Sequence, residues 1–589
     1  MPDGSADTLL TMTQRWLAAF EAALVRGDAT ALAALFAPDG HWRDLLALTW
    51  RVGTLSGAPA IATALTGGDR LAATDFAIAP GRTPPRRVTR AGVETIEAIF
   101  RFHGAAGPGE GVVRLLPGDA ATPARAWTLL TALAALDGHP EATGAARPTG
   151  AAYSRDFRGP NWLDRRRAAA AYADRDPAVL VVGAGQAGLS IAARLGRLGV
   201  DTLVVERNAR VGDNWRHRYH ALTLHNQVHV NHLPYMPFPP SWPVYIPKDM
   251  LAFWFETYAE AMELNVWCGS ELARARYDEA VARWDATLRR ADGTERIVRP
   301  RHIVMATGVS GIPLRPELPG LTDFAGTVLH AGEWRDGAEW AGRRAIVVGT
   351  GTSGHDIAQD LHAAGAAVTM VQRSPTMVVN LEPSAQLPYA LYEEGPDLAD
   401  CDLLAAAMPL APLRAAHRLL TARARELDRK LLDGLERRGF RLAFGPDDTG
   451  WQFSYLTRGG GYYFNVGCSE LIVAGEVGLV QYADLDHFEP AGARRRDGAL
   501  LAADLVVLAT GYRGQEALVG RLFGDAVARR VGPIWGFDET RQELNAMWTR
   551  TGQPGLWFIA GSFAQCRIYS RVLALQIGAI EAGLLDAAA

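Results

Sequence analysis

The feature that most constrains this chain is a strand, a glycine turn, a helix and a second strand between Ala178 and Arg207. The run V-L-V-V that opens it is typical of a strand buried on both faces of a parallel sheet. Gly183, Gly185 and Gly188 then form G-x-G-x-x-G at the start of a predicted helix. Such glycines permit a tight turn, close approach of a pyrophosphate and close packing of the helix, whose N-terminus attracts phosphates. We therefore expect a dinucleotide here, with a chance glycine turn as the alternative.

An acidic residue occupies the position at the end of the second strand that this pattern requires. Glu206 ends the second strand, 18 residues after Gly188. From that position a carboxylate can accept hydrogen bonds from both hydroxyls of an adenosine ribose. Glu206 therefore favours a dinucleotide with an unphosphorylated ribose, such as FAD or NAD.

The same pattern recurs between Arg344 and Arg373, and this repeat is the strongest functional signal in the sequence. Its glycine turn reads G-T-G-T-S-G, and its second strand ends in Gln372-Arg373-Ser374 rather than in an acid. An arginine cannot accept bonds from ribose hydroxyls, but its fork of donors can hold a 2′-phosphate. We expect FAD at the first turn and NADPH at the second. A duplicated scaffold of two FAD-like folds is the alternative.

Composition argues against several other classes. The net charge is −4 and no basic stripe is visible, which argues against a nucleic-acid partner. The four cysteines lie far apart without C-x-x-C, so neither a disulfide framework nor a metal site is expected. The N-terminus lacks a secretory signal pattern, and no apolar run approaches the ~20 residues of a membrane span. We expect a cytoplasmic protein with no membrane partner.

Residues 1–148 are predicted to form a separate α+β domain. Helical spacing of Trp16 and Phe20, and alternation from Ile96 onward, indicate helices followed by strands. This order resembles the nuclear-transport-factor-2 (NTF2)/SnoaL-like cone, on pattern alone. Some such cones use a catalytic Asp or His, so His41 and Asp44 are candidates, with surface or capping roles as the alternative. By default we interpret the domain as a packing or dimerisation module, and in the second case the protein would be a homodimer.

The predicted fold class is therefore α/β, with two Rossmann-like dinucleotide-binding domains behind an N-terminal α+β domain. The insertion within the second domain is rich in leucine and forms either a packed core or a substrate-pocket lid. The predicted boundaries are a linker at 149–176, a first part of the FAD-binding domain at 177–341, an NADP-binding domain at 342–505 with a helical insertion at 388–444, and a second FAD-binding part at 506–589.

A more specific motif stands between the two repeats. Residues 324–334 read F-A-G-T-V-L-H-A-G-E-W and match F-x-G-x-x-x-H-x-x-x-[FYW]. Through this motif the chain resembles the flavin-containing monooxygenases, the class B flavoprotein monooxygenases. Disulfide reductases share the glycine turns and lack the motif. Arg335 departs from the usual Pro or Asp. The resemblance spans about Val179 to Leu585, and with the N-terminal domain it is similar to the bacterial type II branch.

The resemblance implies roles for individual residues. In the family an Asn before a Phe-Pro motif lies near flavin C4a, and His225 or Asn226 falls at that place. His330, inside the fingerprint, is implied as a hinge or NADP contact, with a general-base role as the alternative. The residues implied to hold FAD are Gly183, Gly185, Gly188, Glu206, Asn214 and Trp215, and those implied to hold NADP are Gly349, Gly351, Ser353, Gly354, Arg373 and Ser374.

The implied reaction reduces the flavin with NADPH, adds oxygen at C4a as a (hydro)peroxide and passes one oxygen atom to a small organic substrate. NADH is an alternative donor. In Baeyer–Villiger members the loop that here holds His225 carries an Asp, which this chain lacks, and a mobile Arg acts where Asn465 to Gly467 stand. We predict oxygenation of a sulfide or an amine. Ketone oxidation and indole-3-pyruvate-type oxidative decarboxylation are alternatives within the family.

Two further classes are set against this prediction. A pyridine-nucleotide disulfide reductase would need a pair of cysteines after the first turn, and the sequence has none there. A non-catalytic NADPH sensor would keep both folds and use the N-terminal domain as its output. Bound flavin that bleaches with NADPH and recolours in air would exclude the sensor.

Overall fold

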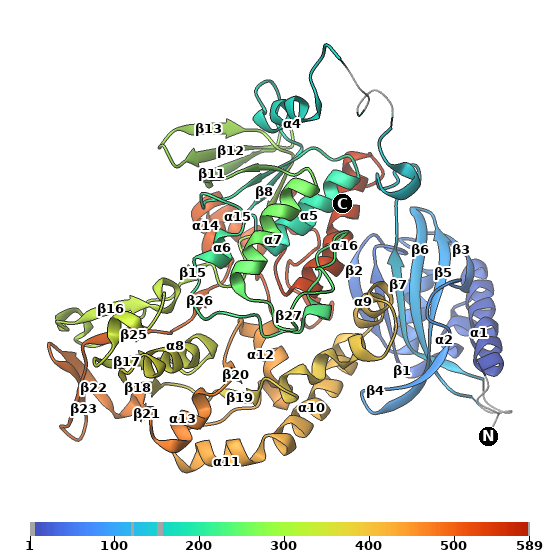
Figure 1. Ribbon diagram of the computed structural model, residues 1–589. Coiled ribbons are helices and arrows are strands. Elements are labelled where there is room, and N and C mark those ends of the chain that lie inside the picture. The colour runs from blue at the N-terminus through green and yellow to red at the C-terminus, as the bar shows by residue number, and fades with distance from the viewer. Residues whose placement is uncertain (1–5, 119–122, 150–152, 154–156, 587–589) are drawn as a thin grey trace.

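The computed structural model describes residues 6–118, 123–149, 153 and 157–586. Figure 1 shows three parts: a blue N-terminal sheet at one side, a first nucleotide fold above, and a second nucleotide fold with orange and yellow helices below. No helix among these residues carries an apolar stretch long enough to cross a bilayer.

A seven-stranded sheet forms the N-terminal domain, in the order β2-β1-β7-β6-β5-β3 with β4 paired to β5. β1 runs parallel to β7, and the other pairs are antiparallel. The helices are α1 (Ala6–Arg26), α2 (Ala29–Ala34) and α3 (Ala58–Thr66), and the strands are β1 (Phe36–Leu45), β2 (Val52–Ser56), β3 (Ala73–Ile78), β4 (Arg86–Arg90), β5 (Val93–Gly104), β6 (Gly107–Leu116) and β7 (Arg125–Leu133).

Aromatic side chains fill the space between this sheet and its helices. Trp16 stacks on Phe20 with ring centroids 5.1 Å apart, and Phe76 stacks on Phe102 at 4.8 Å. The same apolar cluster continues into the rest of the chain, for example through Leu404 of α9 (Leu398–Ala406). The N-terminal domain therefore shares a core with helix α9 and with α16 (Phe563–Glu581).

The first nucleotide fold is a parallel five-stranded sheet in the order β10-β9-β8-β14-β29. β8 (Val179–Val182) lies at its centre, and the glycine turn leads from β8 into α5 (Gln186–Arg197). The other elements are β9 (Thr202–Val205), α6 (Asp213–Arg216), α7 (Lys248–Ala261), β10 (Asn265–Trp267), β14 (His302–Met305) and β29 (Leu556–Phe558), with an antiparallel flap of β11 (Ser270–Asp278), β12 (Arg283–Arg290) and β13 (Glu295–Val298).

The second nucleotide fold repeats this plan, in the order β16-β25-β17-β18-β21. Two Rossmann-like sheets were predicted, and both are confirmed. β16 and β25 pair in the second sheet, so this unit takes strands from outside or at the edge of the predicted 342–505. The elements are β16 (Thr327–His330), β17 (Arg344–Val348), α8 (Thr352–Ala363), β18 (Ala367–Gln372), β21 (Gly478–Gln481), β25 (Leu505–Leu508) and an antiparallel flap of β22 (Leu485–Glu489), β23 (Gly492–Arg495) and β24 (Leu500–Ala502).

Helices connect the second fold to the N-terminal domain, as Figure 1 shows for α9, α10 and α11. Strands β19 and β20 pair in parallel, and Thr352, directly after the glycine turn of the second fold, donates through Oγ1 to Tyr462 O of β20. The elements are β19 (Met377–Asn380), the 3₁₀ helix η7 (Ser384–Glu393), α9, α10 (Leu410–Leu427), α11 (Arg429–Arg437), α12 (Gly450–Arg458), β20 (Tyr462–Asn465) and α13 (Cys468–Ala474).

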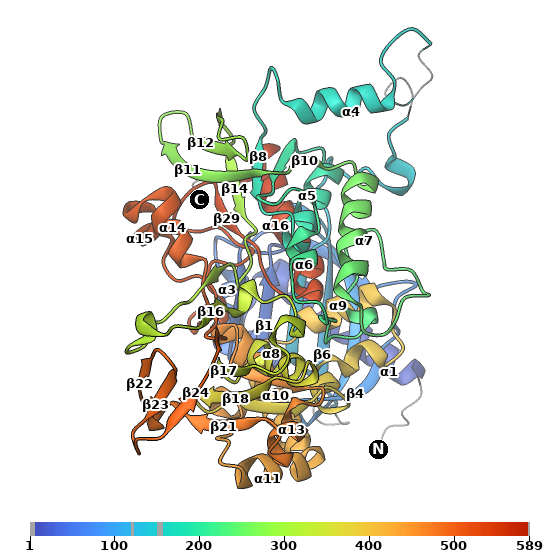
Figure 2. The ribbon, with the colours of Figure 1, turned by 60° about the vertical axis from the view of Figure 1, so that its left-hand side comes forward.

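The linker and the C-terminal part complete the chain. α4 (Trp162–Ala171) begins at Asn161, whose side chain caps the helix, and projects from the body in Figure 2. The remaining elements are β15 (Ile312–Pro313), β26 (Tyr512–Arg513), α14 (Glu516–Phe523), α15 (Asp525–Val531), β27 (Phe537–Asp538) and β28 (Glu543–Leu544). The likeness of the N-terminal domain to an NTF2/SnoaL-like cone stays a prediction.

Candidate functional site

A cavity of about 1490 Å³ lies where the parts of the molecule meet. Its wall takes residues from the first glycine turn, from the polar loop after β9, from the N-terminal domain and from α10 and α12. Five of the six residues implied for FAD line it: Gly183, Gly185, Glu206, Asn214 and Trp215.

The three glycines of the first turn meet different surroundings. A Cβ on Gly188 would lie 1.8 Å from the carbonyl oxygen of Gly183, so this glycine lets α5 pack on β8. Gly183 has φ +107°, and a Cβ there would lie 2.8 Å from the Ala306 oxygen. A Cβ on Gly185 would meet only Asn214 Nδ2 within 4 Å, at 3.5 Å, on the cavity wall. The turn therefore leaves room for a ligand at its middle glycine.

Glu206 is held in place at the end of β9. It is 7% exposed, and its carboxylate accepts hydrogen bonds from Ala184 N at 2.9 Å, Asn208 N at 2.9 Å and Asn208 Nδ2 at 2.7 Å. A carboxylate offers about four lone-pair positions, so acceptor capacity remains for a ligand hydroxyl.

Several buried donors on the cavity wall have no hydrogen-bond partner among the described residues. They include Trp215 Nε1, Thr307 Oγ1 and Tyr512 OH. The Trp215 ring stacks on Phe563 with centroids 6.5 Å apart, which fixes the direction of its N–H. Buried polar groups are seldom unpaired, so a ligand rich in acceptors is expected here. FAD fits this requirement.

The second glycine turn has the same backbone and lies apart from the cavity wall. A Cβ on Gly354 would lie 2.2 Å from the oxygen of Gly349, as in the first turn, whereas a Cβ on Gly351 would meet nothing closer than 3.8 Å. Ser353 follows in the first turn of α8, where free N–H groups accumulate. This turn also has room for a pyrophosphate.

The strand pairing shows which residue takes the place of Glu206. Gly183 N donates to Val205 O and Gly349 N donates to Val371 O, so the residue that follows the acceptor is Glu206 in one fold and Gln372 in the other. Gln372 is fully buried and turned to another segment: its Nε2 donates to Arg441 O at 2.9 Å. Arg373 and Ser374 follow at the surface, and no described carboxylate lies within 4.0 Å of the Arg373 guanidinium. This arrangement fits a 2′-phosphate.

His225 and Asn226 both border the cavity. The ring of His225 packs on Phe464 with centroids 4.6 Å apart, and its nitrogens have no hydrogen-bond partner among the described residues. Burial lowers the pKa of His225 to about 4, so its imidazole is neutral at pH 7. Asn226 Nδ2 donates to Tyr389 OH at 3.0 Å. The loop therefore presents neutral hydrogen-bonding groups.

His330 uses both of its ring nitrogens within the chain. Nδ1 accepts from Gly332 N at 3.0 Å, and Nε2 donates to Gly511 O at 3.1 Å, so the ring is a neutral Nε2–H tautomer. Burial lowers its pKa. The second bond joins the fingerprint to the A-T-G end of β25. These contacts favour the hinge interpretation over a general base.

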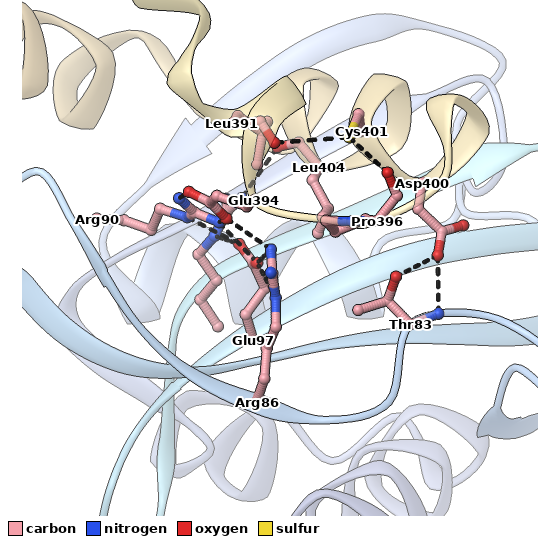
Figure 3. Close-up of polar contacts among 11 residues, drawn as sticks. Thr83, Arg86, Arg90, Glu97, Leu391, Glu394, Pro396, Asp400, Cys401 and Leu404 are labelled. Carbon is pink, nitrogen blue, oxygen red and sulfur yellow. Dashed lines mark hydrogen bonds and ion pairs between the residues drawn. The ribbon is translucent and has the colours of Figure 1, made fainter. Parts of the chain in front are cut away.

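The N-terminal domain forms part of the cavity wall. Arg43 borders the cavity and forms a two-bond ion pair with Glu543 of β28, at 2.7 and 2.6 Å, while its Nη1 donates to Ala406 O. Figure 3 shows a second cluster, in which Arg86 and Arg90 of β4 contact both Glu97 of β5 and Glu394, which directly follows η7. Buried, fully bonded ion pairs of this kind hold the domain in one position.

His41 and Asp44 lie on β1 and away from the lining of the cavity. Asp44 is 4% exposed and accepts from Leu48 N at 3.1 Å, Thr49 N at 2.9 Å and Thr131 Oγ1 at 2.6 Å. His41 Nδ1 contacts Ser56 Oγ at 2.7 Å. The carboxylate has a capping role here, because its bonds go to the turn that follows β1.

Sequence reasoning missed several residues of the site. Tyr389 and His417 come from the helical segment, and Arg43 from the N-terminal domain, yet all border the cavity. Apart from the apolar stretch in which Tyr389 lies, nothing in the sequence indicates that it borders the site. His417 was visible as a lone histidine within an apolar helical stripe. Within the described residues, no three His, Cys, Asp or Glu side chains gather closely enough to hold a metal ion.

Known proteins share this organisation. Residues 180–391 match the family model described as pyridine nucleotide-disulphide oxidoreductase. The chain is 33% identical over 375 residues to an indole-3-pyruvate monooxygenase, YUCCA1, of Oryza sativa subsp. japonica, covering 63% of this chain and 86% of the relative. A probable indole-3-pyruvate monooxygenase of Arabidopsis thaliana, YUCCA7, is 32% identical over 340 residues, which is 57% of this chain and 74% of the relative.

A solved structure has the same fold. It is a cyclohexanone monooxygenase mutant from Rhodococcus sp. Phi1 bound to NADP+, with a TM-score of 0.51 and 16% identity, covering 69% of this chain and 87% of that one. The fold, the two glycine turns and the long alignment with the plant relative lead to the same family. The chain belongs to the flavin-containing monooxygenase family and is an oxidoreductase that uses FAD, NADPH and O₂.

Proposed function

We propose that this enzyme transfers one oxygen atom from O₂ to the sulfur or nitrogen of a small organic substrate. The observation that carries this proposal is the neutral character of the loop over the cavity. Residues 220–238 contain no Asp or Glu, and His225 and Asn226 present neutral groups to the cavity. A sulfide or a tertiary amine has a lone pair of its own and needs no base to activate it.

The proposed cofactor sites follow the two glycine turns. FAD is held by the first turn, Glu206, Asn214 and Trp215, and NADPH by the second turn, Arg373 and Ser374. When bound, the two cofactors supply hydride transfer and oxygen activation. Arg373 selects the 2′-phosphate through charge-assisted hydrogen bonds.

The chain's own residues would exclude water and fix hydrogen bonds at the reacting centre. The imidazole of His225 can donate one hydrogen bond and accept one, and it stays neutral across the working pH range. The side chain of Asn226 is oriented by one contact, in which its Nδ2 donates to Tyr389 OH, and its backbone oxygen accepts from Asn231 Nδ2 at 2.8 Å. Fixed dipoles in a site without bulk water stabilise developing charge better than mobile water does.

A second candidate is oxidative decarboxylation of an arylpyruvate such as indole-3-pyruvate. It is supported by the 33% identical relative, whose name gives that substrate. This route needs an anionic oxygen nucleophile to attack a carbonyl group, which a neutral loop assists less. The likeness to cyclohexanone monooxygenase concerns the fold, so ketone oxidation has no comparable support.

One substrate panel tests these possibilities. Purified flavoprotein is given NADPH, ¹⁸O₂ and, separately, thioanisole, N,N-dimethylaniline, cyclohexanone and indole-3-pyruvate. We expect the sulfoxide and the N-oxide to carry one ¹⁸O atom and to form fastest. Faster formation of a lactone or of indole-3-acetate would overturn the proposal in favour of the corresponding alternative.

A further inference from the structure

Helix α10 presents one face to the cavity, and that face is apolar except at one position. Its cavity-lining residues recur at spacings of three and four, which is the period of a helix side. The residues of this face are Leu410, Leu413, Ala416, His417 and Leu420. A histidine in the middle of such an apolar face requires a structural or functional explanation.

His417 is largely buried and borders the cavity. It is 5% exposed, and its ring meets Phe453 of α12 edge-on with centroids 5.3 Å apart. Its backbone oxygen accepts from Thr421 Oγ1 at 2.7 Å, and no hydrogen bond joins its ring nitrogens to another described residue. Burial lowers the pKa of His417 to about 4, so the ring is neutral.

A largely buried imidazole loses hydration, which costs stability unless a hydrogen bond replaces it, and a leucine would pack there without that cost. A partner from outside the chain would offset this cost. A second group points the same way: Gln452 of α12 also borders the cavity, and its Oε1 is buried without a partner among the described residues. α10 and α12 pack against each other, so both groups belong to one lobe of the cavity.

The partner should carry no net charge. A neutral imidazole offers one donor and one acceptor, and an amide offers both as well. The charged side chains Arg43 and Glu543 on the same wall neutralise each other in a two-bond pair. A hydroxyl, carbonyl or amide group suits such surroundings, whereas a carboxylate would be desolvated without an unpaired cation.

We propose that His417, together with Gln452, hydrogen-bonds an uncharged polar group of the substrate, separate from the atom that is oxygenated. The substrate class is therefore a largely apolar sulfide or amine that also carries a hydroxyl, carbonyl or amide group. This inference rests on the proposed function. It makes His417 a substrate-binding residue and α10 an element that determines specificity.

Matched probes test it. One pair is 4-(methylthio)toluene and 4-(methylthio)benzyl alcohol, which differ by one hydroxyl, and the same pair with a biphenyl spacer covers a longer reach. The acid 4-(methylthio)benzoate supplies the charged comparison. We expect the alcohol of at least one pair to have a KM about threefold to tenfold below that of its partner, the effect of one added hydrogen bond.

Variants separate a binding role from a structural one. In His417→Leu the KM ratio of the pair should fall to about 1, and in His417→Gln part of the preference should return. Gln452→Leu should reduce the ratio less. His487→Leu, at an exposed histidine of β22, is the matched control and should keep the wild-type ratio. The midpoint of thermal unfolding of His417→Leu should equal or exceed that of wild type, because leucine suits the otherwise apolar face of α10 better than a desolvated imidazole does.

The outcomes are distinct. Sulfoxides formed with equal KM values in both pairs, or a preference for the acid, would overturn this inference and leave the proposed function standing. Loss of folding in His417→Leu with no rescue of the ratio in His417→Gln would assign His417 a packing role instead. Absence of sulfoxide from every probe would contradict the proposed function itself.

Discussion

The two glycine turns have nearly the same backbone but different surroundings. In both, a Cβ on the third glycine would strike the carbonyl oxygen of the first, at 1.8 Å in one and 2.2 Å in the other. In the first fold the residue after the second strand, Glu206, faces a large cavity. In the second fold its counterpart, Gln372, is covered by the segment around Arg441.

This difference shows how one supersecondary unit acquires two specificities. The glycines create the anion site in both folds, because they bring backbone N–H groups to the surface of the turn. The ribose is read one strand away, by a carboxylate in the first fold and by the exposed Arg373 in the second. Because Gln372 is buried, the position that holds the acid in the first fold cannot contact a ligand in the second. The next residue, Arg373, is exposed and can contact the ligand instead.

The largest effect should come from the third glycine of each turn. Gly188→Ala forces a Cβ into the backbone and should abolish FAD binding, with a stability loss of about 1–3 kcal/mol beyond that of the missing cofactor. Gly354→Ala should retain yellow flavin and lose reduction by NADPH. Flavin content and anaerobic bleaching measure the two effects. A flavin-free Gly354→Ala protein would break the assignment of cofactors to turns.

The next largest effect should come from Arg373. Arg373→Ala removes the donors for a 2′-phosphate and should raise the KM for NADPH about tenfold to a hundredfold, while the KM for NADH changes little. Steady-state kinetics with both donors measure this. Arg343→Ala, at an exposed arginine before β17, serves as the control. An equal effect on NADPH and NADH would show that Arg373 does not read the phosphate.

A smaller effect is expected in the first fold from Glu206→Gln. The new amide would direct an N–H group at Ala184 N or at Asn208 N, which now donate to the carboxylate. The Kd of FAD for the apoprotein should rise about tenfold. Flavin fluorescence titration measures it, with Glu476→Gln at the surface as the control. An unchanged Kd would mean that the ribose is held elsewhere.

These comparisons also show what the sequence could predict. The two turns, the fingerprint and Glu206 are patterns within about 30 residues, where spacing dictates which groups meet. The presence of two Rossmann-like sheets followed from the same patterns, but the pairing of β16 with β25 in the second sheet did not. The N-terminal domain gave weaker signals, since its helices and strands could be predicted but not the surface on which it docks.

Contacts between residues that are distant in the sequence could not be predicted from such local patterns. Arg43 and Glu543 are 500 residues apart, and each looks like an ordinary surface charge in its own stretch. The burial of Gln372 depends on Arg441, 69 residues later. His417 falls at the period of an apolar helix face, which predicts burial but not whether a cavity lies beyond it.

The smallest predicted effect concerns the residue two places after the third glycine, which is Ser190 in the first fold and Asp356 in the second. Ser190 is fully buried, and its hydroxyl has no partner among the described residues. The carboxylate of Asp356 accepts from the Tyr219 hydroxyl, which comes from the loop between α6 and α7 of the first fold. Burial raises the pKa of Asp356 to about 6, from about 3.9 when unfolded.

The sign of the pH effect follows from that pKa. Between about pH 4 and pH 6 the folded state binds more protons at this carboxyl than the unfolded state does, so stability falls as pH rises through this window and levels above it. Asp356→Ser copies the first fold and should flatten this change, on the order of 1 kcal/mol. Urea unfolding at pH 4.5 and pH 7.5 measures the difference. In Tyr219→Phe, loss of the hydrogen bond that favours the carboxylate should raise the folded-state pKa of Asp356 and extend the upper end of the window to higher pH. Identical pH dependence in wild type and Asp356→Ser would show that the contact between the two folds carries no titrating charge.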